Sequence, residues 1–133
     1  MCDVACGTRQ TDDVAKLLPA DFDLHSLEHS EQRVCQSFID GLDDTWLVVP
    51  HVPIVVDHQD CEIDVVLVSP ARGVIVVEVK GGTIKVEKGR WYTNSHEMKR
   101  SPFEQATKAK HALIQRMKSS RVDLRQLFVQ HIV

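Results

Sequence analysis

The stretch of residues 73–82 constrains the fold of this chain more than any other part of the sequence. Six of the seven residues before Lys80 are β-branched or glycine, which predicts a strand buried on both faces. Glu78 and Lys80 nevertheless lie inside this strand, two residues apart and therefore on the same face. Burying an unpaired carboxylate or ammonium is costly, so both charges need partners.

The preceding apolar run, residues 63–68, contains one further acid, Asp64. Turn-forming residues 69–73 join the two runs, and a symmetric hairpin about this turn places Asp64 opposite Glu78. Facing side chains lie about 4.5–5.5 Å apart at Cβ, where like charges repel each other. Two facing carboxylates beside Lys80 therefore indicate a hard cation between them. The alternative is an internal Glu78–Lys80 ion pair, with Asp64 at a solvated strand end.

Length and composition predict a single domain. The chain has 133 residues, of which 43% are hydrophobic, and this is enough to form a core. The sequence has no apolar run long enough to span a membrane, no N-terminal signal pattern and no Cys-x-x-Cys motif among its four cysteines. We therefore expect reduced thiols and a cytoplasmic protein that does not contact a membrane.

Charge is distributed unevenly along the chain. Residues 1–80 contain 5 Lys/Arg and 15 Asp/Glu, a net charge of −10, whereas residues 81–133 contain 11 and 4, a net charge of +7. This asymmetry is typical of a protein that holds a cation on one side and a polyanion on the other. For nucleic acid we assign the basic residues Lys85, Lys88, Arg90 and Lys108. The alternative is that these residues are ordinary solvated surface.

The first part of the sequence predicts a leader and a helix. Residues 1–22 are polar, and we expect a leader with a short helix that ends at Leu18. The first confident helix spans residues 26–40, and Gly41 stops it. Glu31 occupies a core position on its apolar stripe. Glu31 is therefore either functional or an acid favoured by the helix dipole in the first turn.

The segments after this helix predict mainly strands. A strand covers residues 46–50, and residues 51–60 form a polar loop whose two histidines receive no role. Beyond the central hairpin, residues 83–93 alternate with period two about a turn and predict a second hairpin. A polar loop then covers residues 94–100.

The last part of the sequence predicts a helix and a strand. Ser101, Pro102 and Glu104 form a strong start for a helix that ends near Ser119, with Phe103 on its buried face. Gln105, in the first turn, is expected to point back toward the hairpin carboxylates. Residues 127–133 predict a final strand that joins the sheet parallel to an earlier strand. Because this strand ends without a polar stop, we expect the chain to be the front part of a longer protein.

This order of motifs resembles the PD-(D/E)XK nuclease superfamily and, within it, the NERD (nuclease-related) domain. The resemblance covers about residues 26–133, and its motifs are residues 30–34, 62–67, 73–82 and 101–105. It implies an α/β fold with a mixed central β-sheet flanked by helices, a restriction-endonuclease-like core in the order αβββαβ. The NERD-like domain would occupy residues 23–133.

The resemblance also implies roles for individual residues. Asp64 and Glu78 would bind a divalent metal, Mg²⁺ or Mn²⁺, and Lys80 would position or activate the attacking water. Glu31 matches the acid of the first helix and could hold a second metal or a water of the first. Gln105 matches the polar residue of the later helix. One departure from the superfamily pattern is that Ile63, not proline, precedes Asp64.

The predicted function is metal-dependent hydrolysis of phosphodiester bonds, in DNA rather than RNA. The backbone carbonyl of Val79 is a further candidate metal ligand. NERD domains usually precede helicase, kinase or other modules, so a linked downstream domain is expected, and a homodimer is compatible with the resemblance. The alternative function is a non-catalytic module that binds nucleic acid or a protein partner.

Overall fold

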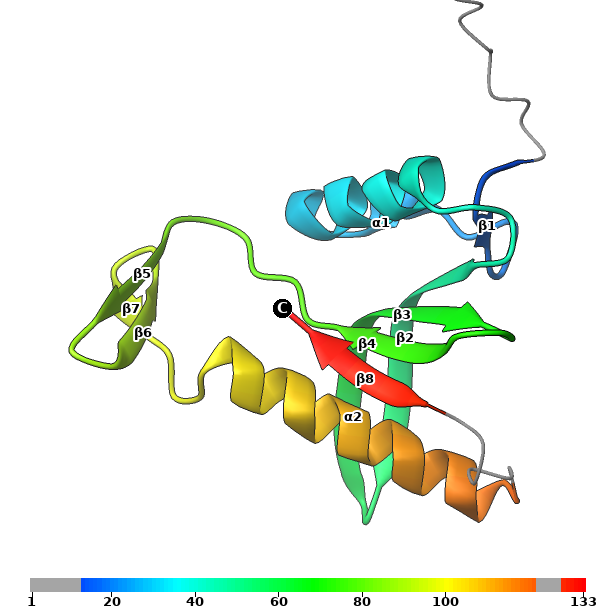
Figure 1. Ribbon diagram of the computed structural model, residues 1–133. Helices are drawn as coiled ribbons and strands as arrows, with labels where there is room; N and C mark the ends of the chain where they lie inside the picture. The colour runs from blue at the N-terminus through cyan, green and yellow to red at the C-terminus, as the bar shows by residue number, and fades with distance from the viewer. Residues whose placement is uncertain (1–12, 122–127) are drawn as a thin grey trace, which may run out of the picture.

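A five-stranded mixed β-sheet forms the centre of the computed structural model, which describes residues 13–121 and 128–133 (Figure 1). The strand order is β1-β2-β3-β4-β8; β1–β2 and β4–β8 are parallel, and β2–β3 and β3–β4 are antiparallel. The elements are β1 (Lys16–Leu17), the 3-10 helix η2 (Leu24–Ser26), α1 (His29–Gly41), β2 (Leu47–Val56), β3 (Gln59–Ser69), β4 (Gly73–Val77), β5 (Ile84–Glu87), β6 (Arg90–Thr93), β7 (His96–Glu97), α2 (Pro102–Ser119) and β8 (Val129–Ile132). The predicted order of helix, three strands, helix and strand is confirmed.

The register of the central hairpin agrees with the sequence prediction. Val65 pairs with Val77 and Ser69 with Gly73, and the turn is closed by a 3.1 Å hydrogen bond from the Arg72 N–H to the Ser69 carbonyl. Gly73 has a φ of 103°, and a Cβ there would lie 2.2 Å from the Phe128 carbonyl oxygen. Glycine is therefore required at the point where the hairpin meets the chain that leads into β8.

The two helices cover opposite faces of the sheet, and each face has its own apolar cluster. Cys35 of α1 packs with Val48, Val65, Leu67 and Val77, whereas Ala109 and Ala112 of α2 pack with Ile54, Ile63, Val66 and Val76. Alternate residues of β3 and β4 therefore enter different layers, as the period of a strand requires. A strand buried on both faces explains the nearly continuous run of valine and isoleucine in the sequence.

Three sequence predictions about the first strands and helix were wrong or shifted. Lys16 and Leu17 form β1 rather than the end of a helix, and Ala15 is buried at 3% exposure, so the predicted leader contributes to the sheet and core. Residues 1–12 lie outside the described part of the chain. Helix α1 begins at His29 rather than residue 26, because residues 24–26 form a separate 3-10 turn.

The predicted loop at residues 51–60 is instead the end of a long hairpin. β2 continues past Pro50 and Pro53 to Val56, and a turn at Asp57 and His58, both with positive φ, leads into β3. From Val49 onward β2 has a partner strand on one side only, and prolines are tolerated at such an edge. The prolines therefore indicated an edge, as expected, but not the end of the strand.

The second predicted hairpin is confirmed as β5 and β6, and β7 adds a third strand from the predicted loop at 94–100. This small sheet, which we call the arm (residues 84–97), projects beyond the first turn of α2 (Figure 1). Phe103 is 54% exposed rather than buried, and its ring contacts Trp91 of the arm with centroids 5.7 Å apart. Small residues of α2 face the sheet instead, namely Ala106, Ala109 and Ala112.

The final strand, β8, runs parallel to β4 from Val129 to Ile132, as predicted, whereas Leu127 lies outside the described residues. Among the helices that the structure describes, none has the length and hydropathy needed to cross a membrane.

Candidate active site

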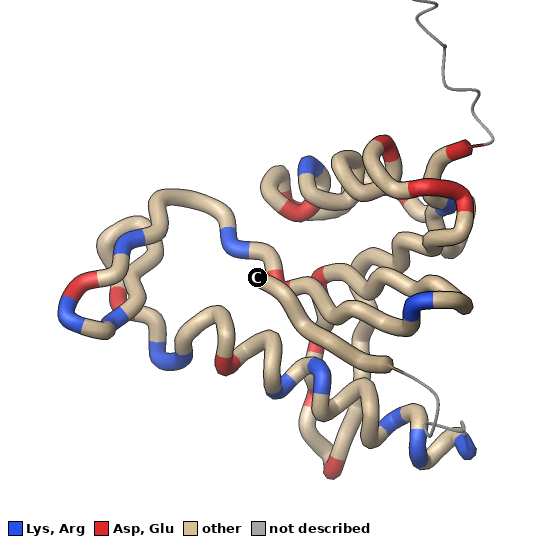
Figure 2. The backbone as a smooth tube through the Cα atoms, viewed as in Figure 1, with Lys and Arg blue, Asp and Glu red and all other residues tan. Residues whose placement is uncertain are grey.

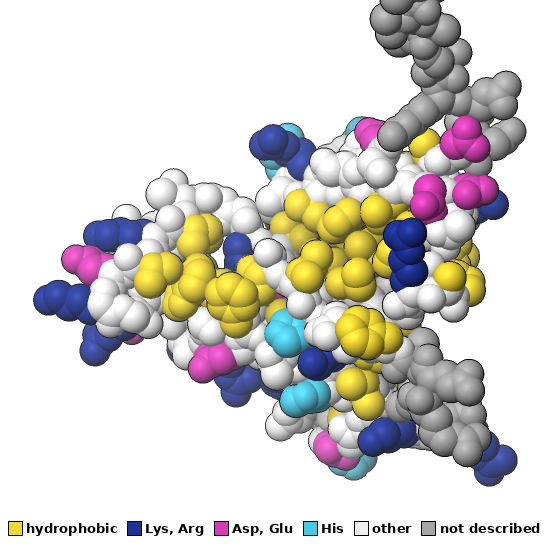
Figure 3. Space-filling view, in the orientation of Figure 1, with side chains coloured by type: hydrophobic (Ala, Val, Ile, Leu, Met, Phe, Trp, Pro, Cys, Tyr) yellow, Lys and Arg dark blue, Asp and Glu magenta, His cyan; other side chains and the backbone are white. Residues whose placement is uncertain are grey.

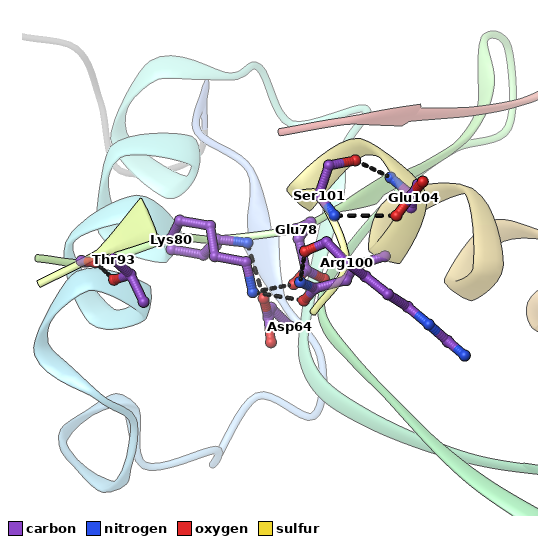
Figure 4. Close-up of polar contacts among 10 residues, drawn as sticks. Asp64, Glu78, Lys80, Thr93, Arg100, Ser101 and Glu104 are labelled. Atoms are coloured by element: carbon purple, nitrogen blue, oxygen red, sulfur yellow. Dashed lines mark hydrogen bonds and ion pairs between the residues drawn. The ribbon is translucent and has the colours of Figure 1, made fainter. Parts of the chain in front are cut away.

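The strand ends bring Asp64, Glu78 and Lys80 together (Figure 4). The Lys80 Nζ lies 2.6 Å from Glu78 Oε1, and the backbone N–H of Val79 donates a 2.8 Å hydrogen bond to Asp64 Oδ2. The hairpin pairing ends at Val65–Val77, and Asp64 and Glu78 are the next residues on each side. They lie close enough for the negative charge of Asp64 to raise the pKa of Glu78.

Gln105 of α2 joins this group through Lys80. Its Oε1 accepts a 2.7 Å hydrogen bond from Lys80 Nζ, while its Nε2 donates to the Arg100 carbonyl oxygen at 3.1 Å. The predicted capping box fixes the start of α2, because Ser101 and Glu104 exchange hydrogen bonds of 3.1 Å in both directions. Gln105 therefore points toward the site from a well-anchored first turn, as predicted.

Glu31, in the first turn of α1, belongs to the same electrostatic environment. Burial raises its pKa above the ordinary value, and the negative charge of Asp64 raises it further. Both interpretations of Glu31 agree with the structure. Glu31 is an acid in the first turn of α1, and it lies close enough to Asp64 to interact with it. Its proximity to Asp64 favours a role at the site.

The surroundings of Asp64 and Glu78 disfavour the charged form of both carboxylates. Burial is the main cause that raises the pKa of both Asp64 and Glu78; Lys80 opposes this rise at both residues, and the Val79 N–H opposes it at Asp64. Glu78 is only 8% exposed, and Asp64 is half-buried rather than at a solvated strand end. A nearby cation would stabilise these groups, since it favours their charged form.

The donor set fits a hard divalent cation such as Mg²⁺ or Mn²⁺. Mg²⁺ prefers oxygen ligands and usually takes one or two protein carboxylates while it keeps several waters. Asp64 and Glu78 meet this requirement, although no three His, Cys, Asp or Glu side chains among the described residues form a preassembled metal cluster. The Glu78–Lys80 ion pair of the alternative interpretation is also present. The two interpretations therefore differ only in whether a metal binds beside this pair.

The four residues assigned to nucleic acid lie on the arm and on α2. Lys85, Lys88 and Arg90 are exposed on the arm, where Lys85 pairs with Glu87 at 2.7 Å and Arg90 with Glu97 at 3.7 Å. Lys108 is exposed on α2 and lines a separate hollow with Cys61 and His111. Figure 2 shows basic positions along the arm and α2, and acidic positions around α1 and the turn after it. The predicted charge asymmetry is therefore visible in space, but these cations do not gather at the site.

A contact between His51 and Glu62, which the sequence did not indicate, lies near Asp64. The Nδ1 of His51 lies 3.2 Å from Glu62 Oε1, and both residues influence the pKa of Asp64, which Glu62 raises and His51 lowers. His51 had been placed in a loop, although its position in β2 falls between the pairs Pro50–Val65 and Val52–Ile63. The only sequence signal was the two-residue spacing of Glu62 and Asp64.

The backbone is irregular where His51 of β2 lies beside Asp64 of β3. His51 has a φ of 52°, and Ile63 and Val65 belong to different apolar layers although strand alternation would place them on one face. Asp64 lies between them, at the point where β3 changes face. The regular alternation of a strand thus fails at Asp64, whose carboxylate lies where the backbone is irregular.

Two hollows meet at Lys80. One, of about 450 Å³, lies beside α1 and is lined by Ser30, Arg33, Phe38 and Val79 together with Lys80. The other, of about 530 Å³, lies beside the arm and the start of α2 and is lined by Thr93, Met98, Lys99 and Gln105 together with Lys80. Arg33 lies in the motif at residues 30–34 but received no role there, and neither did Lys99, because single basic residues on a surface are common.

The mixed sheet between two helices, with an acid on β3 and the Glu78–Lys80 pair after β4, is consistent with the restriction-endonuclease-like fold of the PD-(D/E)XK-like nuclease superfamily. The family model described as nuclease-related domain, NERD, matches residues 26–133. The chain therefore belongs to the NERD family, which is part of that superfamily. No curated protein matches the chain. No solved structure matches it either.

Proposed function

We propose that this domain is a metal-dependent nuclease that hydrolyses phosphodiester bonds, with DNA as its substrate. The observation that carries the proposal is the position of Lys80, whose ammonium contacts both Glu78 and Gln105 beside Asp64. Membership of the nuclease-related family supports the same reaction class. The finer proposals are a cytoplasmic location, a linked downstream domain and a homodimer.

Phosphodiester hydrolysis needs a nucleophilic water, neutralised phosphate charge and a stabilised leaving oxygen. Asp64 and Glu78 would hold Mg²⁺ or Mn²⁺, and the Val79 carbonyl and Glu31 would complete or support the ligand set. When bound, such an ion supplies positive charge and lowers the pKa of a bound water. The raised pKa values of Asp64 and Glu78 mark them as carboxylates whose environment lacks sufficient positive charge.

In this proposal, Lys80 positions the attacking water or a phosphate oxygen. An ammonium group has three N–H donors, and two of them are directed to Glu78 Oε1 and Gln105 Oε1. The third donor is available for the attacking water or a phosphate oxygen, where charge develops in the transition state. Gln105, held by the Arg100 carbonyl, keeps the ammonium oriented while that donor is used.

A binding module without catalysis is the second candidate, and one observation favours it. The Glu78–Lys80 pair gives the buried Glu78 a cationic partner without any metal, which is compatible with a fold that needs none. In that case the domain would bind nucleic acid or a protein partner without cleaving it. Metal-dependent cleavage separates the two candidates.

Asp64→Asn tests the proposal because it keeps the shape of the side chain and removes its charge. We expect the wild type to cleave DNA with Mg²⁺ or Mn²⁺ and the variant to lose at least about 100-fold in rate. Parallel reactions with RNA of the same sequence test the choice of DNA. Equal cleavage by Asp64→Asn would remove Asp64 from the mechanism, and absence of cleavage by the wild type on either nucleic acid would favour the binding module.

A further inference from the structure

Two open hollows lie on either side of Lys80. Their volumes are about 450 and 530 Å³, within the range of about 300–1,000 Å³ that small-molecule pockets occupy. Both include Lys80 in their walls. A strand whose scissile phosphate lies at Lys80 can therefore leave the site through one hollow in each direction.

Cations line both hollows. Arg33 of α1 lines the first, and Lys99 and Arg100, in the segment before α2, line the second. Within the described residues neither Arg33 nor Lys99 lies within 4.0 Å of a carboxylate oxygen; the same holds for Lys88 of the arm, whereas Lys85 and Arg90 are paired with Glu87 and Glu97. Arg33 and Lys99 are unpaired and also border the hollows that reach Lys80, which favours them over the arm for phosphate contacts.

The walls of the hollows also contain apolar surface. Val34, Phe38 and Val79 line the first hollow, and Met98 lines the second. Figure 3 shows hydrophobic side chains gathered between α1 and β8 on the face in view. Apolar and aromatic walls suit the faces of unpaired bases, which stack on such side chains, whereas the bases of a duplex are stacked on one another inside it.

We propose that the site binds single-stranded nucleic acid, with one nucleotide in each hollow and the flanking phosphates on Arg33 and Lys99. This inference deepens the proposed function and rests on it, because Lys80 marks the scissile phosphate. The strand would run from α1 past Lys80 to the turn before α2. Lys85, Lys88 and Arg90 would add only long-range attraction from the arm.

The test measures binding without cleavage. Fluorescence anisotropy of a labelled short single strand, and of the duplex of the same sequence, is recorded in EDTA at several salt concentrations. The variants are Arg33→Ala and Lys99→Ala, and the matched controls are Arg116→Ala and Lys118→Ala, which remove the same charges from exposed positions on α2. Circular dichroism serves to check that all four variants keep the fold.

We expect the wild type to bind the single strand more tightly than the duplex. Arg33→Ala and Lys99→Ala should each reduce the slope of log K against log salt by about 0.7, the value for one lost phosphate contact on a single strand. The controls should leave the slope unchanged. Equal slopes for all four variants, or tighter binding to the duplex, would overturn the inference.

A cleavage assay separates failure of this inference from failure of the proposed function. If Mn²⁺-dependent cleavage by the wild type survives and Arg33→Ala and Lys99→Ala change neither binding nor KM, the strand path is wrong and the nuclease assignment stands. If the wild type does not cleave but both variants lose single-strand binding, the nuclease assignment fails and the binding path is supported.

Discussion

At the scale of single residues, the contact between the buried Glu78 and the partly buried Lys80 explains why two charges directly follow β4, whose valines and isoleucine the sequence had extended through both residues. Each group is the partner that the other requires, at 2.6 Å, and Gln105 satisfies a further donor of Lys80. The sequence predicted this need for partners because both residues interrupt an otherwise apolar strand. It could not show that His51 and Glu62 pair beside Asp64, since that contact depends on the distorted backbone of β2.

Lys80→Ala tests the ion pair through stability. At neutral pH the change leaves Glu78 buried without its cation, and we expect a loss of about 2 kcal/mol in the free energy of unfolding. Burial already raises the pKa of Glu78, and removal of Lys80 raises it further, so the loss should shrink as acid protonates the carboxylate. Urea denaturation at neutral and acidic pH measures both effects.

The control for this experiment is the double variant Lys80→Ala with Glu78→Gln. Glutamine has no charge to leave unpaired, so the double variant should be more stable at neutral pH than Lys80→Ala alone. A double variant that is less stable than the single one would contradict the account of the pair.

The pH dependence of metal binding follows from the same carboxylates. Burial raises the pKa of Glu31, Asp64 and Glu78 above their ordinary values, so these groups bind more protons in the folded state than in the unfolded state. Stability of the metal-free protein should therefore rise as pH falls from the raised pKa values toward the ordinary ones of 3.8 and 4.5. Metal competes with these protons, and its stabilising effect should disappear over the same window.

Melting temperatures with Mn²⁺ and with EDTA across this pH range check the prediction. The difference between the two curves should be largest at neutral pH and vanish on acidification, and it should be smaller throughout in Glu78→Gln. A difference that is independent of pH would mean that the metal binds elsewhere.

At the scale of elements, the site depends on how α1 lies against the segment that leaves β4. A Cβ on Gly81 would lie 2.6 Å from Ser30 Oγ and 2.9 Å from Ser30 Cβ, so only glycine lets α1 approach so closely. Gly81→Ala should therefore displace α1, with Glu31 and Arg33, at a cost of about 1–3 kcal/mol. Unfolding free energy and metal-dependent cleavage should both fall.

Gly41→Ala is the matched control, because a Cβ at Gly41 would meet no atom within 4 Å. Ser30→Gly combined with Gly81→Ala should restore part of the lost stability, since it removes the contacted side chain. If Gly81→Ala behaves like Gly41→Ala, the close approach of α1 is not needed at this position.

Most elements were predictable from local patterns, and the exceptions have identifiable causes. The central hairpin followed from its turn and its two apolar runs, and α2 from its capping box. β1 and β7 have two residues each, too few for a periodic pattern, so tertiary pairing alone defines them. Phe103 was predicted as core but contacts Trp91, because the arm lies beside the first turn of α2.

At the scale of the whole molecule, the acidic and basic halves of the sequence occupy different regions. Acidic positions cluster around α1 and the turn after it, while basic ones follow the arm and α2 (Figure 2). The sequence correctly indicated this separation, and its assignment of phosphate contacts to the arm and Lys108 stays a prediction. Residues that line the hollows around Lys80 became visible only when the fold brought α1 and the start of α2 to the same site.

The proposed nuclease site of this NERD-family chain consists of Asp64, Glu78 and Lys80. Nicking of supercoiled plasmid by the wild type and Lys80→Ala, side by side in Mn²⁺ and in EDTA, is the decisive measurement, with Lys118→Ala as the control. We expect nicking only with Mn²⁺, retained in Lys118→Ala and lost in Lys80→Ala while the variant stays folded. Nicking that persists in Lys80→Ala, or in EDTA, would rule out this site.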